Sequence, residues 1–111
     1  MAKNTNPIID RLLKSYLTEV AKDIHIDDVF LFGSAATNRM RTDSDIDVII
    51  ISKDFEHIPY MRRLQLLSRA NLPLAQQVAI DSFGYTPEEF AEMDTVDSPI
   101  LRQIKKEGYF I

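Results

Sequence analysis

Apolar residues near the start of the chain recur at helical spacing. Between residues 8 and 21 they form adjacent pairs repeated every four residues, with polar side chains between the pairs. This period places the apolar side chains on one stripe of a helix, and Pro7 suits its first turn. We therefore expect a helix that covers one face of a sheet.

Three short runs of bulky and β-branched residues predict strands, at residues 29–32, 45–51 and 78–83. The leucine-rich segment 58–70 predicts a second helix, with Pro59 near its start. Strands that alternate with helices favour an α/β domain.

The second half of the chain carries local signals for two more helices. Thr86-Pro87 and Ser98-Pro99 each combine an N-cap residue with a proline at the first helical position. The later helix is expected to end at Gly108, and residues 109–111 suit a last short strand. Because no linker or repeat interrupts the pattern, residues 1–111 are interpreted as one domain.

Composition and charge narrow the class of protein. The chain has 111 residues, 45% hydrophobic and 27% charged, a composition typical of a packed core rather than of disorder. With 17 acidic and 13 basic residues its net charge is −4, which disfavours binding a nucleic-acid backbone by bulk attraction. A nucleotide held through a divalent cation is compatible with this charge, and an RNA acceptor stays open.

The absence of cysteine excludes disulfides, thiolate metal sites and cysteine nucleophiles. No apolar run approaches the roughly 18 residues that span a bilayer, and the N-terminus lacks a signal-peptide core. We therefore expect a cytoplasmic protein without a membrane partner.

The candidate chemistry lies around Gly33-Ser34 and, after ten intervening residues, Asp45 and Asp47. Backbone N–H groups and a serine hydroxyl at the end of a strand suit an anion such as a phosphate, and glycine lets that phosphate approach closely. Two carboxylates two residues apart on a strand share one face, about 7 Å apart, and suit hard divalent cations. Ser34 could also serve only as a helix cap.

Asp81 follows an apolar run of its own, so a third carboxylate joins the pair if its strand lies beside residues 45–51. Three carboxylates, a phosphate-binding Gly-Ser and Mg²⁺ fit phosphoryl transfer with two metal ions. Two plainer interpretations stay open. Asp81 could cap a strand end, and Arg39 and Arg41 could be surface cations of a loop rather than phosphate contacts.

The run Phe32-Gly33-Ser34 followed by residues 42–48, Thr-Asp-Ser-Asp-Ile-Asp-Val, resembles the signature of the DNA polymerase beta superfamily of nucleotidyltransferases. At this length the chain is similar to its minimal nucleotidyltransferase (MNT) members. The resemblance implies an α/β (α+β) domain of the polymerase beta-like nucleotidyltransferase fold, with a mixed β-sheet flanked by helices. It implies that Asp45, Asp47 and Asp81 hold two Mg²⁺ ions. It also implies that the Gly-Ser pair binds the triphosphate of ATP or another nucleotide, and that an acceptor hydroxyl attacks the α-phosphate.

The family resemblance also implies a setting. Many minimal members pair with a small helical HEPN-domain protein as a toxin–antitoxin system, and some attach AMP to a tyrosine of the toxin. This chain departs from the family pattern after Ser34. Family members commonly have arginine one and three residues after the serine, followed by glycine, and this chain has Ala35, Thr37 and Asn38 at those positions. Arg39 and Arg41 are the candidate replacements for binding the phosphates.

Two functions therefore compete at this point. The first is an Mg²⁺-dependent nucleotidyltransferase that moves AMP from ATP to a hydroxyl of a partner. The second is a binding module of the same fold that neutralises its partner by forming a complex, with weak turnover or none. A domain of this size encloses little substrate surface, so an acceptor protein or a second copy is expected to complete the site.

Overall fold

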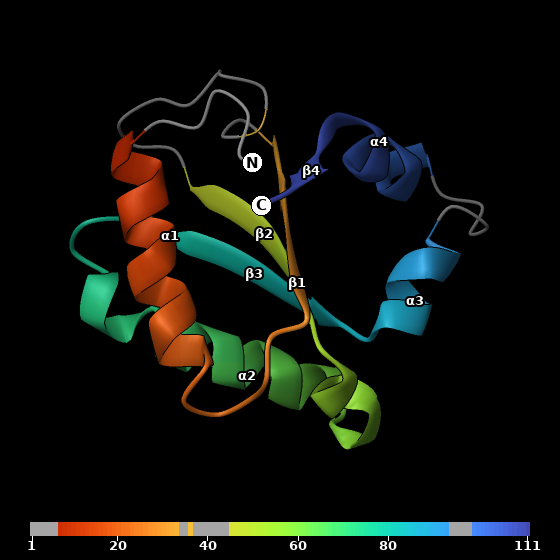
Figure 1. Cartoon of the computed structure of the whole chain (residues 1–111), viewed down its shortest axis with the longest axis horizontal. Helices are drawn as coiled ribbons and strands as arrows, with labels where there is room; N and C mark the ends of the chain where they lie inside the picture. Colours follow the sequence, from red (N-terminus) through yellow and green to blue (C-terminus); the bar gives the residue numbers. More distant parts are fainter. Residues whose placement is uncertain (1–6, 34–35, 37–44, 94–98) are drawn as a thin grey trace.

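The protein folds around a mixed four-stranded sheet with the strand order β3-β2-β1-β4, flanked by helices (Figure 1). The structure is a computed structural model that describes residues 7–33, 36, 45–93 and 99–111. The elements in chain order are α1 (Pro7–Val20), β1 (Asp28–Phe32), β2 (Ile46–Ile51), the 3₁₀ helix η2 (Lys53–His57), α2 (Tyr60–Ala70), the 3₁₀ turn η3 (Leu72–Leu74), β3 (Ile80–Tyr85), α3 (Pro87–Glu92), α4 (Pro99–Glu107) and β4 (Tyr109–Phe110).

The sheet combines two kinds of strand pairing. β1 pairs antiparallel with β2 and with β4, whereas β2 pairs parallel with β3. The parallel pair needs a crossover, which η2, α2 and η3 supply between the two strands. The predicted mixed sheet flanked by helices is therefore confirmed.

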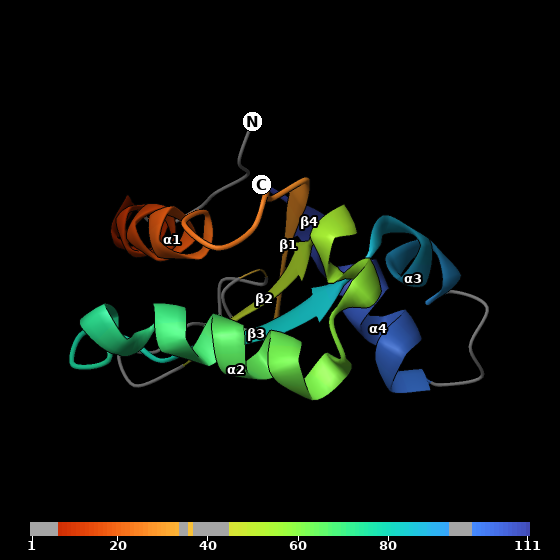
Figure 2. The same ribbon diagram turned by 90° about the horizontal axis from the view of Figure 1, so that it is seen from below.

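Alternate residues of the strands build two separate cores. On one face, Val48 and Ile50 of β2 pack with the apolar stripe of α1 and with Leu67 of α2. On the other face, Ile49 and Ile51 pack with side chains from α3 and α4. Figure 2 shows α1 and α2 on one side of the sheet and α3 and α4 on the other. This alternation follows from the two-residue period of a strand.

The predicted helices are present, with shifted ends. The segment 58–70 is helical only from Tyr60, because Pro59 takes an extended conformation and residues 53–57 form a separate 3₁₀ helix. The Thr86 side chain accepts a hydrogen bond from the Glu89 backbone, and the Glu89 side chain accepts one from the Thr86 backbone, as a capping box requires. No helix within the described ranges is both long and apolar enough to cross a bilayer.

The third strand corrects the sequence-based boundary. Residues 78–83 were the predicted strand, but β3 runs from Ile80 to Tyr85. Val78 instead donates its backbone N–H to the carbonyl of Leu74, which prolongs the turn after η3. Asp81 is consequently the second residue of its strand.

A buried arginine links the crossover to the sheet. Arg63 of α2 is only 6% exposed, and its guanidinium donates hydrogen bonds to the carbonyls of Ile58, Gly84 and Phe55 at 2.8, 3.1 and 2.8 Å. It also pairs with the carboxylate of Glu89 at 2.6 Å. One side chain therefore ties α2, η2, β3 and α3 together.

Candidate active site

Three strand ends meet at one end of the sheet. Phe32, the last residue of β1, pairs with Asp47 in the antiparallel register. Asp47 in turn pairs with Asp81 in the parallel register of β2 and β3. The backbone after β1 and two carboxylates that lie 34 residues apart in the sequence are thereby neighbours.

Gly33 brings the chain after β1 against the carboxylate of Asp47. Its φ is +73°, in the left-handed region that side chains rarely adopt. A Cβ built on Gly33 would collide with Oδ2 of Asp47 and lie 3.2 Å from Cγ. Glycine is therefore required here both by backbone conformation and by space.

The carboxylates of the site are close enough to affect one another's protonation. Burial, together with the nearby charges of Asp81 and Asp45, raises the pKa of Asp47 to about 6. Burial and a hydrogen bond with Asp45 raise the pKa of Asp81. The repulsion among these groups is the kind that a bound cation relieves.

Three aspartates supply the hard oxygen ligands that Mg²⁺ prefers. Among the residues that the structure describes, however, no group of three or more His, Cys, Asp or Glu side chains is arranged to hold a metal ion. The register fixes the backbones of Asp47 and Asp81, while the side chains of Asp45 and Asp81 are exposed. The donor set fits a divalent cation chemically, and rotation of exposed side chains would be needed to close a ligand shell.

The structure brings together four of the predicted site residues, Gly33, Asp45, Asp47 and Asp81. The remaining predicted residues, Ser34, Arg39 and Arg41, lie outside the described residues, and their assignment to the nucleotide stays a prediction.

Two cavities adjoin this site, on the face covered by α3 and α4. The first, of about 250 Å³, is lined by Asp47 and by apolar and aromatic side chains: Phe32, Ile49, Tyr60, Phe83, Tyr85, Met93, Leu101 and Ile104. The second, of about 510 Å³, lies beside Gly33 and is lined by Phe32 and five residues of α4, Pro99, Ile100, Gln103, Ile104 and Glu107. The carboxylates are therefore flanked by largely apolar hollows.

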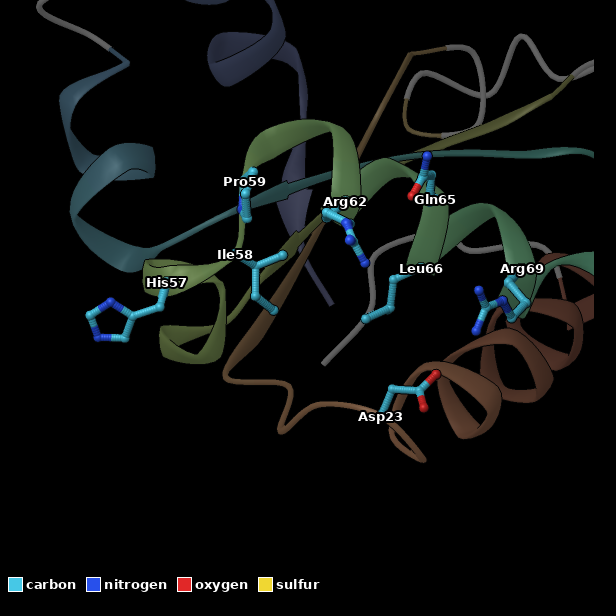
Figure 3. Close-up of a pocket in the computed structure, with 8 residues that line it drawn as sticks. All are labelled: Asp23, His57, Ile58, Pro59, Arg62, Gln65, Leu66 and Arg69. Atoms are coloured by element: carbon cyan, nitrogen blue, oxygen red, sulfur yellow. The ribbon is translucent and has the colours of Figure 1, made fainter.

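A further cavity of about 540 Å³ lies on the opposite face of the sheet (Figure 3). Arg62, Leu66 and Arg69 of α2 line one side of it, and Asp23, after α1, lines the other. The sheet separates it from Asp47, so it has no direct part in chemistry at the carboxylates.

Sequence patterns did not single out Tyr60, Tyr85 or Arg63 as functional residues. Both tyrosines line the cavity at Asp47. No local pattern predicts this, because Tyr60 begins α2 and Tyr85 ends β3, and only the tertiary structure brings them together. For Arg63, its position on the helix face shared with Leu67 was a usable signal of burial.

Known structures share this fold at low sequence identity. A candidate nucleotidyltransferase from Sulfolobus solfataricus superposes with a TM-score of 0.61 at 22% identity, covering 90% of this chain and 76% of its own. A toxin–antitoxin structure with AMP-PNP gives a TM-score of 0.55 at 16% identity, covering 86% and 68%. BolA1 from Arabidopsis thaliana also gives 0.55, at 18% identity, covering 70% and 94%.

At these identities the likeness shows the fold alone, and a shared fold does not imply a shared function. A comparison with curated proteins finds no match. The profile of the family described as "Polymerase beta, Nucleotidyltransferase" matches residues 13–111, a span that contains Gly33 and all three aspartates. The chain belongs to the polymerase beta nucleotidyltransferase family.

Proposed function

We propose that the protein is an Mg²⁺-dependent nucleotidyltransferase that moves AMP from ATP to a hydroxyl of a partner protein. One observation carries the proposal: the strand register places Asp47 beside Asp81 and under the backbone of Gly33. This is where a cation and a phosphate would have to meet. Family membership supports the general activity.

Asp45, Asp47 and Asp81 are the residues that would hold Mg²⁺, as two ions. The bound metal would neutralise charge on the phosphates and position them for in-line displacement. The raised pKa values of Asp47 and Asp81 suit this role, because a cation favours the ionised carboxylates that the metal-free site disfavours.

Gly33 and Ser34, together with Arg39 and Arg41, would bind the triphosphate. The open backbone at Gly33 supports this assignment, because no side chain separates it from the carboxylates. In the reaction, the acceptor oxygen bonds to the α-phosphorus, the bond to pyrophosphate breaks, and the acceptor proton passes to a carboxylate. Asp81 is the candidate for that proton, since its side chain is exposed and it lies beside Asp47 in the strand register.

The acceptor is proposed to be a small helical protein of the HEPN type, for which this chain would act as the antitoxin. The fold similarity to a toxin–antitoxin structure with AMP-PNP supports a toxin as the partner and an adenine nucleotide as the donor. The HEPN type rests on the resemblance to the minimal family members. A second copy of the chain, or an RNA, is the alternative acceptor.

The test is transfer of α-labelled ATP in Mg²⁺ to the purified protein encoded beside this chain. We expect label on that protein with the wild-type chain and a loss of at least about 100-fold with Asp47→Asn, since several kcal/mol of charge stabilisation are removed. Asp23→Asn is the matched control, because Asp23 is exposed on the other face of the sheet.

The second candidate function is a binding module without turnover, favoured by Ala35, Thr37 and Asn38 at positions where the family commonly has arginines and a glycine. A stable complex that still silences the neighbour without any label transfer, and that is insensitive to Asp47→Asn, would replace the enzymatic proposal with this one.

A further inference from the structure

The cavity beside Asp47 differs in character from the rest of the site. Of its nine lining residues only Asp47 is charged, and the others are aliphatic or aromatic. Phe32 and Phe83 lie on its sheet side, with ring centroids 6.2 Å apart. Such a surface suits a flat, uncharged group rather than a phosphate.

Two phenols supply its polar part. Tyr60 and Tyr85 come from α2 and β3, and their ring centroids lie 6.0 Å apart. Burial and a hydrogen bond with Tyr85 raise the pKa of Tyr60 to about 12. Both tyrosines line the cavity, and a phenol hydroxyl can donate or accept a hydrogen bond.

The register of β3 separates the two phenols from the carboxylates. Asp81, Phe83 and Tyr85 alternate along β3 and so share one face of the sheet. Four residues of strand separate Asp81 from Tyr85, which corresponds to about 13 Å. A ligand held by a phosphate at the aspartates would thus extend along Phe83 toward the two hydroxyls.

We propose that this cavity holds the base of the donor nucleotide, and that Tyr60 and Tyr85 are specificity-determining residues that read its polar edge. The inference rests on the proposed function, because it takes the phosphates to lie at Asp47. The base would lie among Phe32, Phe83 and Leu101, with the ribose between it and the aspartates.

An aromatic side chain of the acceptor is the other flat group that this surface could take. The arrangement favours the base. If an aromatic residue of the acceptor entered the cavity with its hydroxyl toward Asp47, the acceptor's backbone would lie at the hydroxyls of Tyr60 and Tyr85. The edge of a base instead offers hydrogen-bond donors and acceptors that these two hydroxyls can pair with.

Binding of MgATP and of magnesium tripolyphosphate, each measured by calorimetry, separates base recognition from phosphate recognition. Leu101→Trp fills the cavity, so it should weaken MgATP at least tenfold and change tripolyphosphate affinity by less than about twofold. Leu72→Trp is the matched control, since Leu72 is 69% exposed and lies outside the cavity; it should change neither affinity. Circular dichroism and thermal unfolding confirm that each variant folds.

Removing one hydroxyl tests the specificity role more gently. Tyr85→Phe should alter the preference among ATP, GTP, CTP and UTP by about 2- to 10-fold, the value of one hydrogen bond. An unchanged preference in both Tyr85→Phe and Tyr60→Phe would remove the two tyrosines from base recognition.

The outcomes distinguish this inference from the function beneath it. Suppose that the wild-type chain binds both MgATP and tripolyphosphate, and that Leu101→Trp weakens both affinities equally or changes neither. The cavity then does not hold the base, and the proposed function still stands. If Leu101→Trp spares nucleotide binding but raises the KM for the acceptor, the cavity belongs to the acceptor and the inference is wrong. If neither ligand binds the wild-type chain in Mg²⁺, both proposals fail.

Discussion

The ionised form of the Asp47 carboxyl is disfavoured in the folded chain. Burial, with the nearby charges of Asp81 and Asp45, raises its pKa to about 6, against 3.8 for an unperturbed aspartate. Between those two pH values the folded chain binds more protons than the unfolded chain, so stability falls as pH rises through this window. The group is part-buried, and solvent screening reduces the effect to about 1–2 kcal/mol.

We therefore predict that Asp47→Asn is more stable than the wild-type chain at pH 7 in EDTA, by about 1–2 kcal/mol. The difference should vanish near pH 4, where the wild-type carboxyl is protonated. Urea denaturation at both pH values measures it. Equal stability of the two proteins at pH 7 would contradict the crowding of charge described for this site.

Gly33 is the second residue whose identity the geometry restricts. Gly33→Ala places a methyl group on the Asp47 carboxylate and holds alanine at φ +73°. We expect a stability loss of about 1–2 kcal/mol and a larger proportional loss of nucleotidyl transfer, because Asp47 must move. Thermal unfolding and the label-transfer assay measure the two effects.

Gly108→Ala is a useful comparison for Gly33→Ala. A Cβ there would meet the ring of Phe30 and the carbonyl of Leu31, away from the aspartates. It should destabilise the fold without a specific effect on Mg²⁺ dependence. If both variants lose activity only in proportion to stability, the role of Gly33 in the site is refuted.

At the scale of elements, the crossover between β2 and β3 decides whether the two aspartates meet. Arg63 fixes the start of this crossover through three backbone carbonyls and Glu89. Tyr16 secures its other end, because its hydroxyl donates to the carbonyl of Leu67 at 2.9 Å and contacts the hydroxyl of Ser82. α1, α2 and β3 are held together by these buried polar contacts as well as by apolar packing.

Arg63→Ala is predicted to cost about 3–5 kcal/mol, because it leaves buried carbonyls and a carboxylate without their donor. Its neighbour provides the control. Arg62 is exposed, so Arg62→Ala should change stability by less than about 0.5 kcal/mol. Denaturant unfolding of both variants measures the difference, and similar losses for the two would show that the Arg63 contacts add little.

At the scale of the whole molecule, the mixed sheet gathers the site at one end. β1 runs opposite to β2, so its last residue, Phe32, pairs with Asp47 near the start of β2, and Asp47 pairs with Asp81 near the start of β3. A sheet of this kind does not by itself specify a chemistry, because one fold can carry several functions. What distinguishes this chain is the chemistry at that end, a glycine and three carboxylates.

Cation binding at this end should be visible in the stability of the entire domain. We predict that Mg²⁺ at about 100 times its dissociation constant stabilises the wild-type chain by about 2.7 kcal/mol, mainly above pH 6, where Asp47 is ionised. Calorimetric unfolding with Mg²⁺ and with EDTA measures this. Asp47→Asn should lose most of the gain and Asp23→Asn should keep it; an equal gain in all three proteins would place the cation elsewhere.

The sequence by itself determined the local structure, because its signals act between near neighbours. The stripe of α1, the cap at Thr86 and the stop at Gly108 all involve residues within a few positions of each other. Asp45 and Asp47 were likewise predictable as neighbours on one face, and the family signature added what spacing alone could not.

Tertiary structure decided what depends on register and crossover. Nothing local specifies that Asp81 pairs with Asp47, that Gly33 leaves room for its carboxylate, or that Tyr60 and Tyr85 border one cavity. The hydrogen-bond partners of Arg63 were unpredictable for the same reason, since three of the four come from η2, β3 and α3. Helix periods and caps can be predicted from residues that are close together in the sequence. A site made from three strand ends forms only after the two cores have packed, because that packing determines which strands are neighbours and in which register they pair.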